Sequence, residues 1–284
     1  MIINGKEISK ALKAKLSERV VALEEKYGRT PNLVVVLVGD DPGSVSYVTG
    51  KAKAATEVGI RNSTLRYPDS VSEEELLSLI NKLNEDDDVD GILVQLPLPA
   101  HINEDKIISA IISEKDVDGF HPENVARLWL KQPCVLPCTP KGIIKLLNST
   151  GIEIEGKQTV VVGRSKIVGL PVAKLLLDNN ATVTVAHSRT NNLGDVTRRA
   201  DILVVAIGKE RLIKADMIKP GAVVIDVGVN RDSRNGKLCG DVDFEAAQEV
   251  ASHITPVPGG VGPMTIACLM ENTVECFERK MEKK

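Results

Sequence analysis

The stretch Gln158-Thr-Val-Val-Val-Gly-Arg-Ser-Lys-Ile-Val-Gly-Leu-Pro171 decides the fold. Its β-branched run, Thr159 to Val162, predicts a fully buried strand that ends at a glycine. A polar loop then leads to Gly169 and to Pro171, which suits the first turn of a helix. A strand, a glycine turn and a helix N-terminus form a phosphate cradle, because free N–H groups and the helix dipole converge there. A tight turn without a ligand is the alternative, since the glycine spacing is wider than in GxGxxG.

Strand and helix patterns alternate on both sides of this stretch, which predicts an α/β protein with parallel sheets. Before it, we expect strands at 33–38, 60–67 and 91–96 and helices at 8–27, 44–58, 73–83, 104–112 and 140–147, the last with Thr139 as its N-cap. After it, we expect strands at 182–186, 201–207 and 222–227, a hairpin-like turn at Asn235-Gly236 and a helix from 264 to about 280.

Two proline-rich crossings interrupt this alternation. Residues 132–140 contain three prolines and predict a domain boundary, and residues 254–263 form a second crossing that is rich in proline and glycine. A chain of 284 residues is long enough for two domains of ordinary size.

Composition excludes several classes of protein. The net charge is −3 without a basic block, so neither nucleic acid nor a membrane surface is expected as a partner. No apolar run is long enough to span a bilayer, and we expect no targeting peptide. The five cysteines lack metal-type spacing, so we expect reduced thiols, no metal site and a cytoplasmic protein. The acidic run 85–90 could bind Mg²⁺, but a solvated loop is the preferred interpretation.

The residues that follow the predicted strand 182–186, which is the next strand after the cradle, indicate which nucleotide binds. In a dinucleotide fold this strand end meets the adenine ribose, where a carboxylate favours NAD and a cation accommodates the 2′-phosphate of NADP. Here the strand leads into His187, Ser188 and Arg189, and Arg164 lies in the cradle loop. Guanidinium groups match phosphate, so we predict NADP. A solvated role for Arg189 and a catalytic role for His187 remain open.

The first half of the chain contains the candidate catalytic and substrate-binding residues. Tyr47 and Lys51 are four residues apart, so they share one face near the start of a helix. A partly desolvated amine at that end would lose its proton readily, which suits proton transfer. Gln95 lies at the end of a strand and Asp118 in an Asp-Gly loop, where an amide could bind an amine and a carboxylate an amidine-like edge. The alternatives are surface positions for Tyr47 and Lys51, a hydrogen-bonded amide at the strand edge for Gln95, and an ordinary Asx turn for Asp118.

Six motifs together resemble one family, the bifunctional methylenetetrahydrofolate dehydrogenase/methenyltetrahydrofolate cyclohydrolases. They lie in the family's order and cover the chain from about residue 2 to its end. The motifs are GDDPGSVSYVTGKAKA (39–54), GILVQLPLP (91–99), KDVDGF (115–120), PCTPKG (137–142), VVGRSKIVGLP (161–171) and ITPVPGGVGPM (254–264).

The resemblance implies an α/β fold of two domains with a cleft between them. A folate-binding catalytic domain would comprise residues 1–138 plus 264–284, and a Rossmann-like NADP domain residues 139–263. The implied reactions are the oxidation of 5,10-methylenetetrahydrofolate by NADP⁺ and the hydrolysis of the methenyl product to 10-formyltetrahydrofolate. The resemblance further implies tetrahydrofolate derivatives as ligands, a homodimer, and a place in one-carbon metabolism that supplies purine, methionine and histidine biosynthesis.

The resemblance also assigns roles to single residues. Lys51 matches the essential lysine, Gln95 the amide that tunes it, Tyr47 the ring stacked on the p-aminobenzoate and Asp118 the acid that holds the pterin. The remaining matches are Leu96, Pro258, Gly259 and Gly260 for the folate and Gly163, Arg164, Ser165, Ser188, Arg189 and Val229 for the cofactor. Gly50 departs from helical propensity, because glycine weakens a helix by about 1 kcal/mol relative to alanine.

Two other classes of protein compete with this interpretation. A dehydrogenase of the shikimate type also combines an α/β substrate domain with a nucleotide domain and uses a lysine, but it would not need the Asp118 loop or Pro258-Gly-Gly. A nucleotide-binding regulator without turnover would not need intact Lys51, Gln95 and Asp118.

Overall fold

The chain folds into two compact units in a computed structural model, which describes residues 1–283. Unit 1 contains Met1–Lys10 and Thr139–Thr265, and unit 2 contains Ala11–Cys138 and the chain from Ile266 onward. Two long helices, α1 (Gly5–Tyr27) and α10 (Val261–Glu282), contribute residues to both units.

The N-terminal residues belong to unit 1, whereas the sequence placed all of residues 1–138 in one domain. Backbone pairing explains the difference. The N–H of Ile3 donates to the carbonyl of Ile254 at 2.9 Å, and the N–H of Lys6 donates to that of Gly259 at 3.1 Å. The other predicted domain limits stay predictions.

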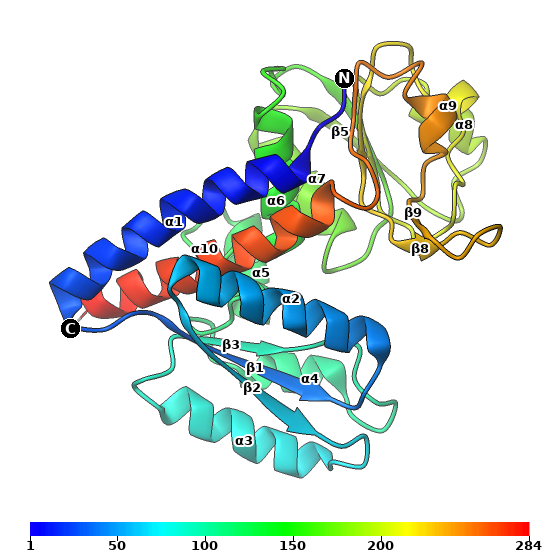
Figure 1. Cartoon of the computed structure of the whole chain (residues 1–284). Coiled ribbons are helices and arrows are strands. Elements are labelled where there is room, and N and C mark those ends of the chain that lie inside the picture. The colour runs from blue at the N-terminus through cyan, green and yellow to red at the C-terminus, as the bar shows by residue number, and fades with distance from the viewer. Residues whose placement is uncertain (284) are drawn as a thin grey trace. The chain divides into compact units, whose positions relative to one another are not determined.

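Unit 2 is built on a parallel sheet with the order β2-β1-β3 (Figure 1). The strands are β1 (Asn32–Val38), β2 (Arg61–Tyr67) and β3 (Gly91–Val94). The buried side chains of β1 alternate between its two faces. Val34, Val36 and Val38 pack with residues of helices α3 (Glu73–Glu85) and α4 (Glu104–Ala110) in one hydrophobic cluster.

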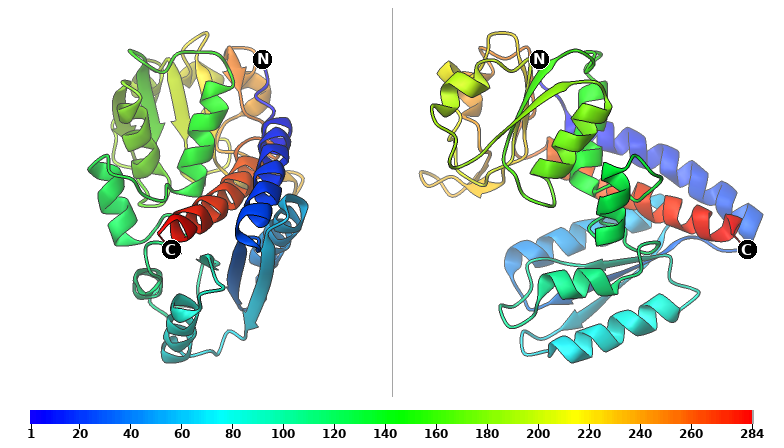
Figure 2. Two further views of the ribbon diagram at one scale, coloured as in Figure 1. Left: turned by 90° about the vertical axis from the view of Figure 1, so that its left-hand side faces the viewer. Right: turned by 180° about the vertical axis from the view of Figure 1, so that it is seen from behind.

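Helix α2 (Pro42–Val58) begins two residues before its predicted start at Ser44, and α3 begins at Glu73, as predicted. Asp41 caps α2 by accepting the N–H of Ser44, and Ser72 and Glu75 form a capping box at the start of α3. Helices α1 and α10 lie side by side (Figure 2), and within unit 2 Arg19 of α1 forms an ion pair with Glu278 of α10.

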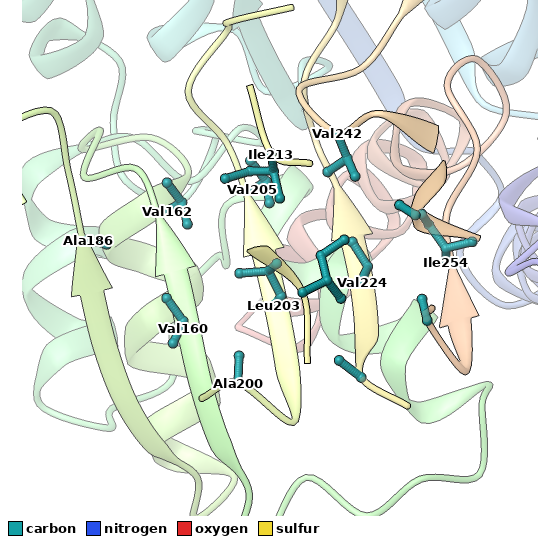
Figure 3. Close-up of a cluster of buried hydrophobic side chains, with 14 residues drawn as sticks. Val160, Val162, Ala186, Ala200, Leu203, Val205, Ile213, Val224, Val242 and Ile254 are labelled. Atoms are coloured by element: carbon teal, nitrogen blue, oxygen red, sulfur yellow. The ribbon is translucent and has the colours of Figure 1, made fainter. Parts of the chain in front are cut away.

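Unit 1 is built on a parallel sheet with the order β10-β7-β6-β4-β5, so β4 has neighbours on both sides. The strands are β4 (Gln158–Val162), β5 (Thr182–Ala186), β6 (Ile202–Val205), β7 (Val223–Asp226) and β10 (His253–Ile254). Aliphatic side chains from β4, β6 and β7 form one core cluster, which Val242 and Ile213 complete (Figure 3). The cradle helix α7 (Gly169–Asp178) follows β4, and Pro171 lies in its first turn.

The structure differs from the sequence prediction at α6 (Cys138–Asn148). Thr139 is not its N-cap but lies inside the helix, where its hydroxyl forms a hydrogen bond with the hydroxyl of Thr265 at 2.9 Å. The predicted turn at Asn235-Gly236 is confirmed, because it joins the antiparallel strands β8 (Asn230–Arg231) and β9 (Leu238–Cys239). Short elements escaped prediction: α5 (Pro122–Trp129), α8 (Leu193–Thr197), a 3₁₀ turn (Ala215–Met217), α9 (Phe244–Ala247) and β10.

Candidate active site

Lys51 is a buried lysine of unit 2. It lies on α2 with only 4% of its surface exposed. Its Nζ donates to Oε1 of Gln95 at 3.0 Å and lies 4.9 Å from the centre of the Tyr47 ring. The structure therefore brings these three predicted residues together, and the four-residue spacing explains why Tyr47 and Lys51 share a face.

Gln95 follows β3 directly, and both ends of its amide have partners. Nε2 donates to the carbonyl of Leu96 at 2.6 Å, so Oε1 is the atom that faces Lys51. A neutral acceptor thus holds the amine without adding a charge. Leu96 is half-buried beside it and precedes Pro97 through a cis peptide bond.

Asp118 lies close enough to Lys51 for their charges to interact. Burial raises the pKa of the Asp118 carboxyl above its ordinary value, the positive charge of Lys51 opposes this rise, and the negative charge of Asp116 adds to it. The turn needs a glycine, because Gly119 has φ +73° and a Cβ there would lie 2.6 Å from the backbone nitrogen of Pro137.

The Asp118 loop is held by an α10 residue that the sequence analysis missed. Asn272 is fully buried, and its Nδ2 donates to the carbonyls of Val117 and Leu136, each at 2.8 Å. An amide in the middle of an apolar helix is the signal that could have revealed it, because a buried amide must find partners. Asp116 completes the loop by accepting the N–H of His121 at 2.8 Å.

The cradle of unit 1 depends on close backbone approach at two glycines. Gly163 has φ +128°, and a Cβ there would lie 2.2 Å from the carbonyl oxygen of Ala206. A Cβ on Gly169 would lie 2.3 Å from the carbonyl oxygen of Gly163. Neither position accepts a side chain, so the loop between them lies close against β4 and β6.

A cavity of about 270 Å³ opens beside this cradle in unit 1. No aspartate or glutamate lines it, whereas Arg164 and Lys209 do, so it suits a phosphorylated ligand. The lining residues are Val162, Gly163, Arg164, His187, Ser188, Leu193, Ala206, Ile207, Lys209 and Leu212. Lys209 was missed by the sequence analysis, although it follows a buried strand of the same sheet.

Three of the predicted cofactor residues line this cavity and three do not. Gly163, Arg164 and Ser188 belong to the lining, but Ser165, Arg189 and Val229 do not. The hydroxyl of Ser165 instead accepts the N–H groups of Val168 and Gly169, each at 3.2 Å, and so helps to start α7. Arg189 and Val229 are exposed, and their roles in binding stay predictions.

Pro258, Gly259 and Gly260 lie in unit 1 immediately before α10. Gly259 has φ +110°, and a Cβ on Gly260 would lie 2.7 Å from the carbonyl oxygen of Pro256. The segment is therefore a tight backbone turn that only glycine fits.

Among residues 1–283, no helix is both long and apolar enough to cross a bilayer. No group of three or more His, Cys, Asp and Glu residues in that range could hold a metal ion.

A glycine cradle with a cation-lined cavity, together with a buried lysine held by an amide, defines a nucleotide-dependent α/β enzyme. Two family models match the chain: the tetrahydrofolate dehydrogenase/cyclohydrolase catalytic domain over residues 3–118 and the NAD(P)-binding domain over residues 137–281. The chain belongs to the tetrahydrofolate dehydrogenase/cyclohydrolase family.

Relatives agree with this assignment over the whole length. The bifunctional protein FolD of Geobacillus thermodenitrificans is 59% identical and covers 99% of both chains. The crystal structure of the bifunctional FolD enzyme of Campylobacter jejuni is 50% identical with a TM-score of 0.96, covering 98% of this chain and 99% of its own. The Trypanosoma brucei dehydrogenase-cyclohydrolase, solved with NADP and an inhibitor, is 42% identical with a TM-score of 0.95, covering 99% of this chain and 98% of its own.

Proposed function

We propose that this protein is a bifunctional enzyme that oxidises 5,10-methylenetetrahydrofolate with NADP⁺ and hydrolyses the methenyl product to 10-formyltetrahydrofolate. The observation that carries the proposal is the buried Lys51 amine, held by the neutral amide of Gln95. Family membership supports both activities and disfavours a shikimate-type dehydrogenase or a regulator without turnover.

For the first reaction, the chain has to bind the phosphates of NADP⁺, which when bound supplies the hydride acceptor. The backbone at Gly163 and the start of α7 would hold the diphosphate, because helix N-termini attract anions. Arg164 and Ser188 would hold the 2′-phosphate.

For the second reaction, Lys51 would take a proton from the water that attacks the methenyl carbon. The methenyl group is a cation, so a neutral amine is compatible with it and an ammonium would repel it. Gln95 would keep the lone pair directed by accepting one N–H of the amine. The C–N5 bond then breaks as the hydroxyl of the adduct loses its proton and N5 takes one up, and the formyl group remains on N10.

The other predicted residues would hold the folate. Asp118 would accept two parallel hydrogen bonds from the pterin, and Tyr47 would stack on the p-aminobenzoate ring. Leu96 would contact the folate beside Gln95, and Pro258, Gly259 and Gly260 stay predicted folate-binding residues.

An assay with purified protein, methylenetetrahydrofolate and either NADP⁺ or NAD⁺ tests the proposal. Reduced cofactor and the methenyl chromophore are followed separately. We expect reduced cofactor to accumulate with NADP⁺ and the methenyl signal to decay faster than in buffer. Reduction without faster methenyl decay would refute the second activity, and no reduction would refute the first.

We also propose that the protein is a homodimer that associates through β5. This strand is the last in the sheet order, and Thr182–Ala186 carries no charge that would prevent pairing with another edge. Leu177 and Val185 near it are 53% and 36% exposed. Light scattering should give the mass of a dimer, and Val185→Lys should lower it. A monomeric wild type would refute the proposal.

We propose a cytoplasmic location and a role in one-carbon metabolism that supplies purine, methionine and histidine synthesis. None of the five cysteines, which all lie among residues 1–283, forms a disulfide, as expected in a reducing compartment. Cell fractionation would test the location, and recovery of the protein with secreted material would contradict it.

A further inference from the structure

Two buried carboxylates in unit 1 have no part in the proposed reactions. Asp226 ends β7 with 2% of its surface exposed, and Asp241 follows β9 with none exposed. Such groups are costly to bury, so the hydrogen bonds that they accept indicate what they hold in place.

Asp241 holds the loop that follows β6. Its Oδ2 accepts the N–H groups of Ile207 at 2.7 Å and Gly208 at 3.0 Å, and its Oδ1 accepts that of Lys209 at 2.8 Å. Oδ1 also accepts Nδ2 of Asn230 at 2.9 Å. Three consecutive backbone donors are thus turned towards one carboxylate, and two of these residues line the cavity.

The consequence concerns the carbonyl groups of the same peptides. In a trans peptide the C=O points away from the N–H, so the carbonyls of Ala206, Ile207 and Gly208 point away from Asp241. The position of the Ala206 carbonyl agrees, because its oxygen points towards Gly163 and would lie 2.2 Å from a Cβ there. With its N–H groups occupied, this loop offers acceptors rather than donors to a ligand.

Asp226 fixes Asp241 in turn. Its carboxylate accepts the N–H groups of Asp241 and Val242, each at 2.9 Å, and that of Gly228 at 3.0 Å. A Cβ on Gly228 would lie 2.2 Å from the Asp241 carboxylate, and a Cβ on Gly240 would lie 1.8 Å from that of Asp226. The backbone is packed directly against both carboxylates.

We infer that Asp241 is a positioning residue for cofactor binding, which turns the Ile207–Lys209 loop so that its carbonyl groups receive a hydroxyl or amino donor of the dinucleotide rather than a phosphate. The inference rests on the proposed function. NADP and NAD share these donors, so the loop does not distinguish between them, whereas Arg164 does.

The test compares Asp241→Asn with the wild type at saturating folate. An amide cannot accept all of these N–H groups, so the KM for NADP⁺ and for NAD⁺ should each rise about tenfold. The kcat and the folate KM should change less than threefold. Asp243→Asn is the matched control, since Asp243 pairs with Lys214 and Arg211 and should leave both cofactor KM values unchanged.

Cofactor-induced shifts of the melting temperature provide a second measurement. Gly228→Ala displaces the Asp241 carboxylate without removing it and should reduce the shifts with NADP⁺ and NAD⁺ alike, while the shift with a folate analogue persists. Unchanged cofactor binding in both variants would overturn the inference, as would a loss confined to NADP⁺. Inactivity of the wild type would instead count against the proposed function.

Discussion

The Nζ of Lys51 donates to Oε1 of Gln95 at 3.0 Å, and Nε2 of Gln95 donates to the carbonyl of Leu96. The buried amine therefore has a neutral partner whose orientation is fixed from its other side. This relationship separates the site from an ordinary buried ion pair, because a carboxylate in the same place would favour the charged lysine.

Gln95→Glu tests this relationship. A carboxylate beside the amine would form an ion pair with Lys51 and should lower methenyl hydrolysis at least about tenfold at neutral pH. The measurement is the rate of methenyl hydrolysis, with Gln95→Met as the uncharged comparison. An unchanged rate in Gln95→Glu would contradict the role of the neutral amide.

Cofactor selectivity should depend on Arg164. Arg164→Ala removes a cation that lines the cavity, so the KM for NADP⁺ should rise about tenfold or more while the KM for NAD⁺ changes little. Arg189→Ala is the comparison, because Arg189 is exposed and does not line the cavity; we expect a smaller effect. Equal losses for both cofactors in Arg164→Ala would mean that the 2′-phosphate binds elsewhere.

Stability should depend on pH through Asp226. Burial raises the pKa of its carboxyl from 3.8 to about 7, although the N–H groups of Val242 and Asp241 oppose the rise. Between pH 3.8 and about 7, the folded protein therefore keeps a proton on Asp226 that the unfolded chain has released. This contribution is present at low pH and is lost as the pH rises through about 7, by about 1.4 kcal/mol between pH 6 and pH 8.

Urea unfolding of the wild type and of Asp226→Asn at each pH measures this contribution. The variant has no proton to release at this position, so the free energy of unfolding of the wild type minus that of the variant should fall from pH 6 to pH 8. A constant or rising difference would show that Asp226 stays ionised throughout.

Gly50 should be replaceable. It lies inside α2, and a Cβ there would be 3.5 Å from Cδ1 of Ile266, an ordinary contact distance. Gly50→Ala should raise the free energy of unfolding by up to about 1 kcal/mol, because alanine favours the helix. Gly169→Ala is the opposite case, since its Cβ would collide with the carbonyl of Gly163, and it should destabilise. Denaturant midpoints compare the two; a destabilised Gly50→Ala would contradict the packing described.

Local patterns predicted most of the fold. The aliphatic runs at β1, β4 and β7 are buried on both faces, so their hydrophobicity alone marks them as strands of parallel sheets. The spacing that places Tyr47 and Lys51 on one face of α2 was equally local. Helix α6 starts at Cys138, two residues before the predicted start at Pro140, and Thr139 inside it pairs with Thr265, far along the chain.

The cofactor side shows where sequence patterns are insufficient. Ser165 was predicted only as a cofactor residue, but its hydroxyl also accepts the N–H groups of Val168 and Gly169 at the start of α7. Lys209 and Asp241 were missed because they are 32 residues apart in the chain, and only the folded structure brings them into hydrogen-bond contact. The role of such residues depends on the folded structure and not on the residues next to them in the sequence.

Lys51→Met provides the most direct test of the central claim, that one buried amine serves the hydrolytic step. Methenyl hydrolysis by the variant is measured beside the cofactor-induced shift of its melting temperature, with Lys53→Met, an exposed lysine of the same helix, as control. We expect hydrolysis to fall to the rate in buffer while NADP⁺ binding survives and the control behaves as the wild type. Hydrolysis at the wild-type rate in Lys51→Met would contradict it.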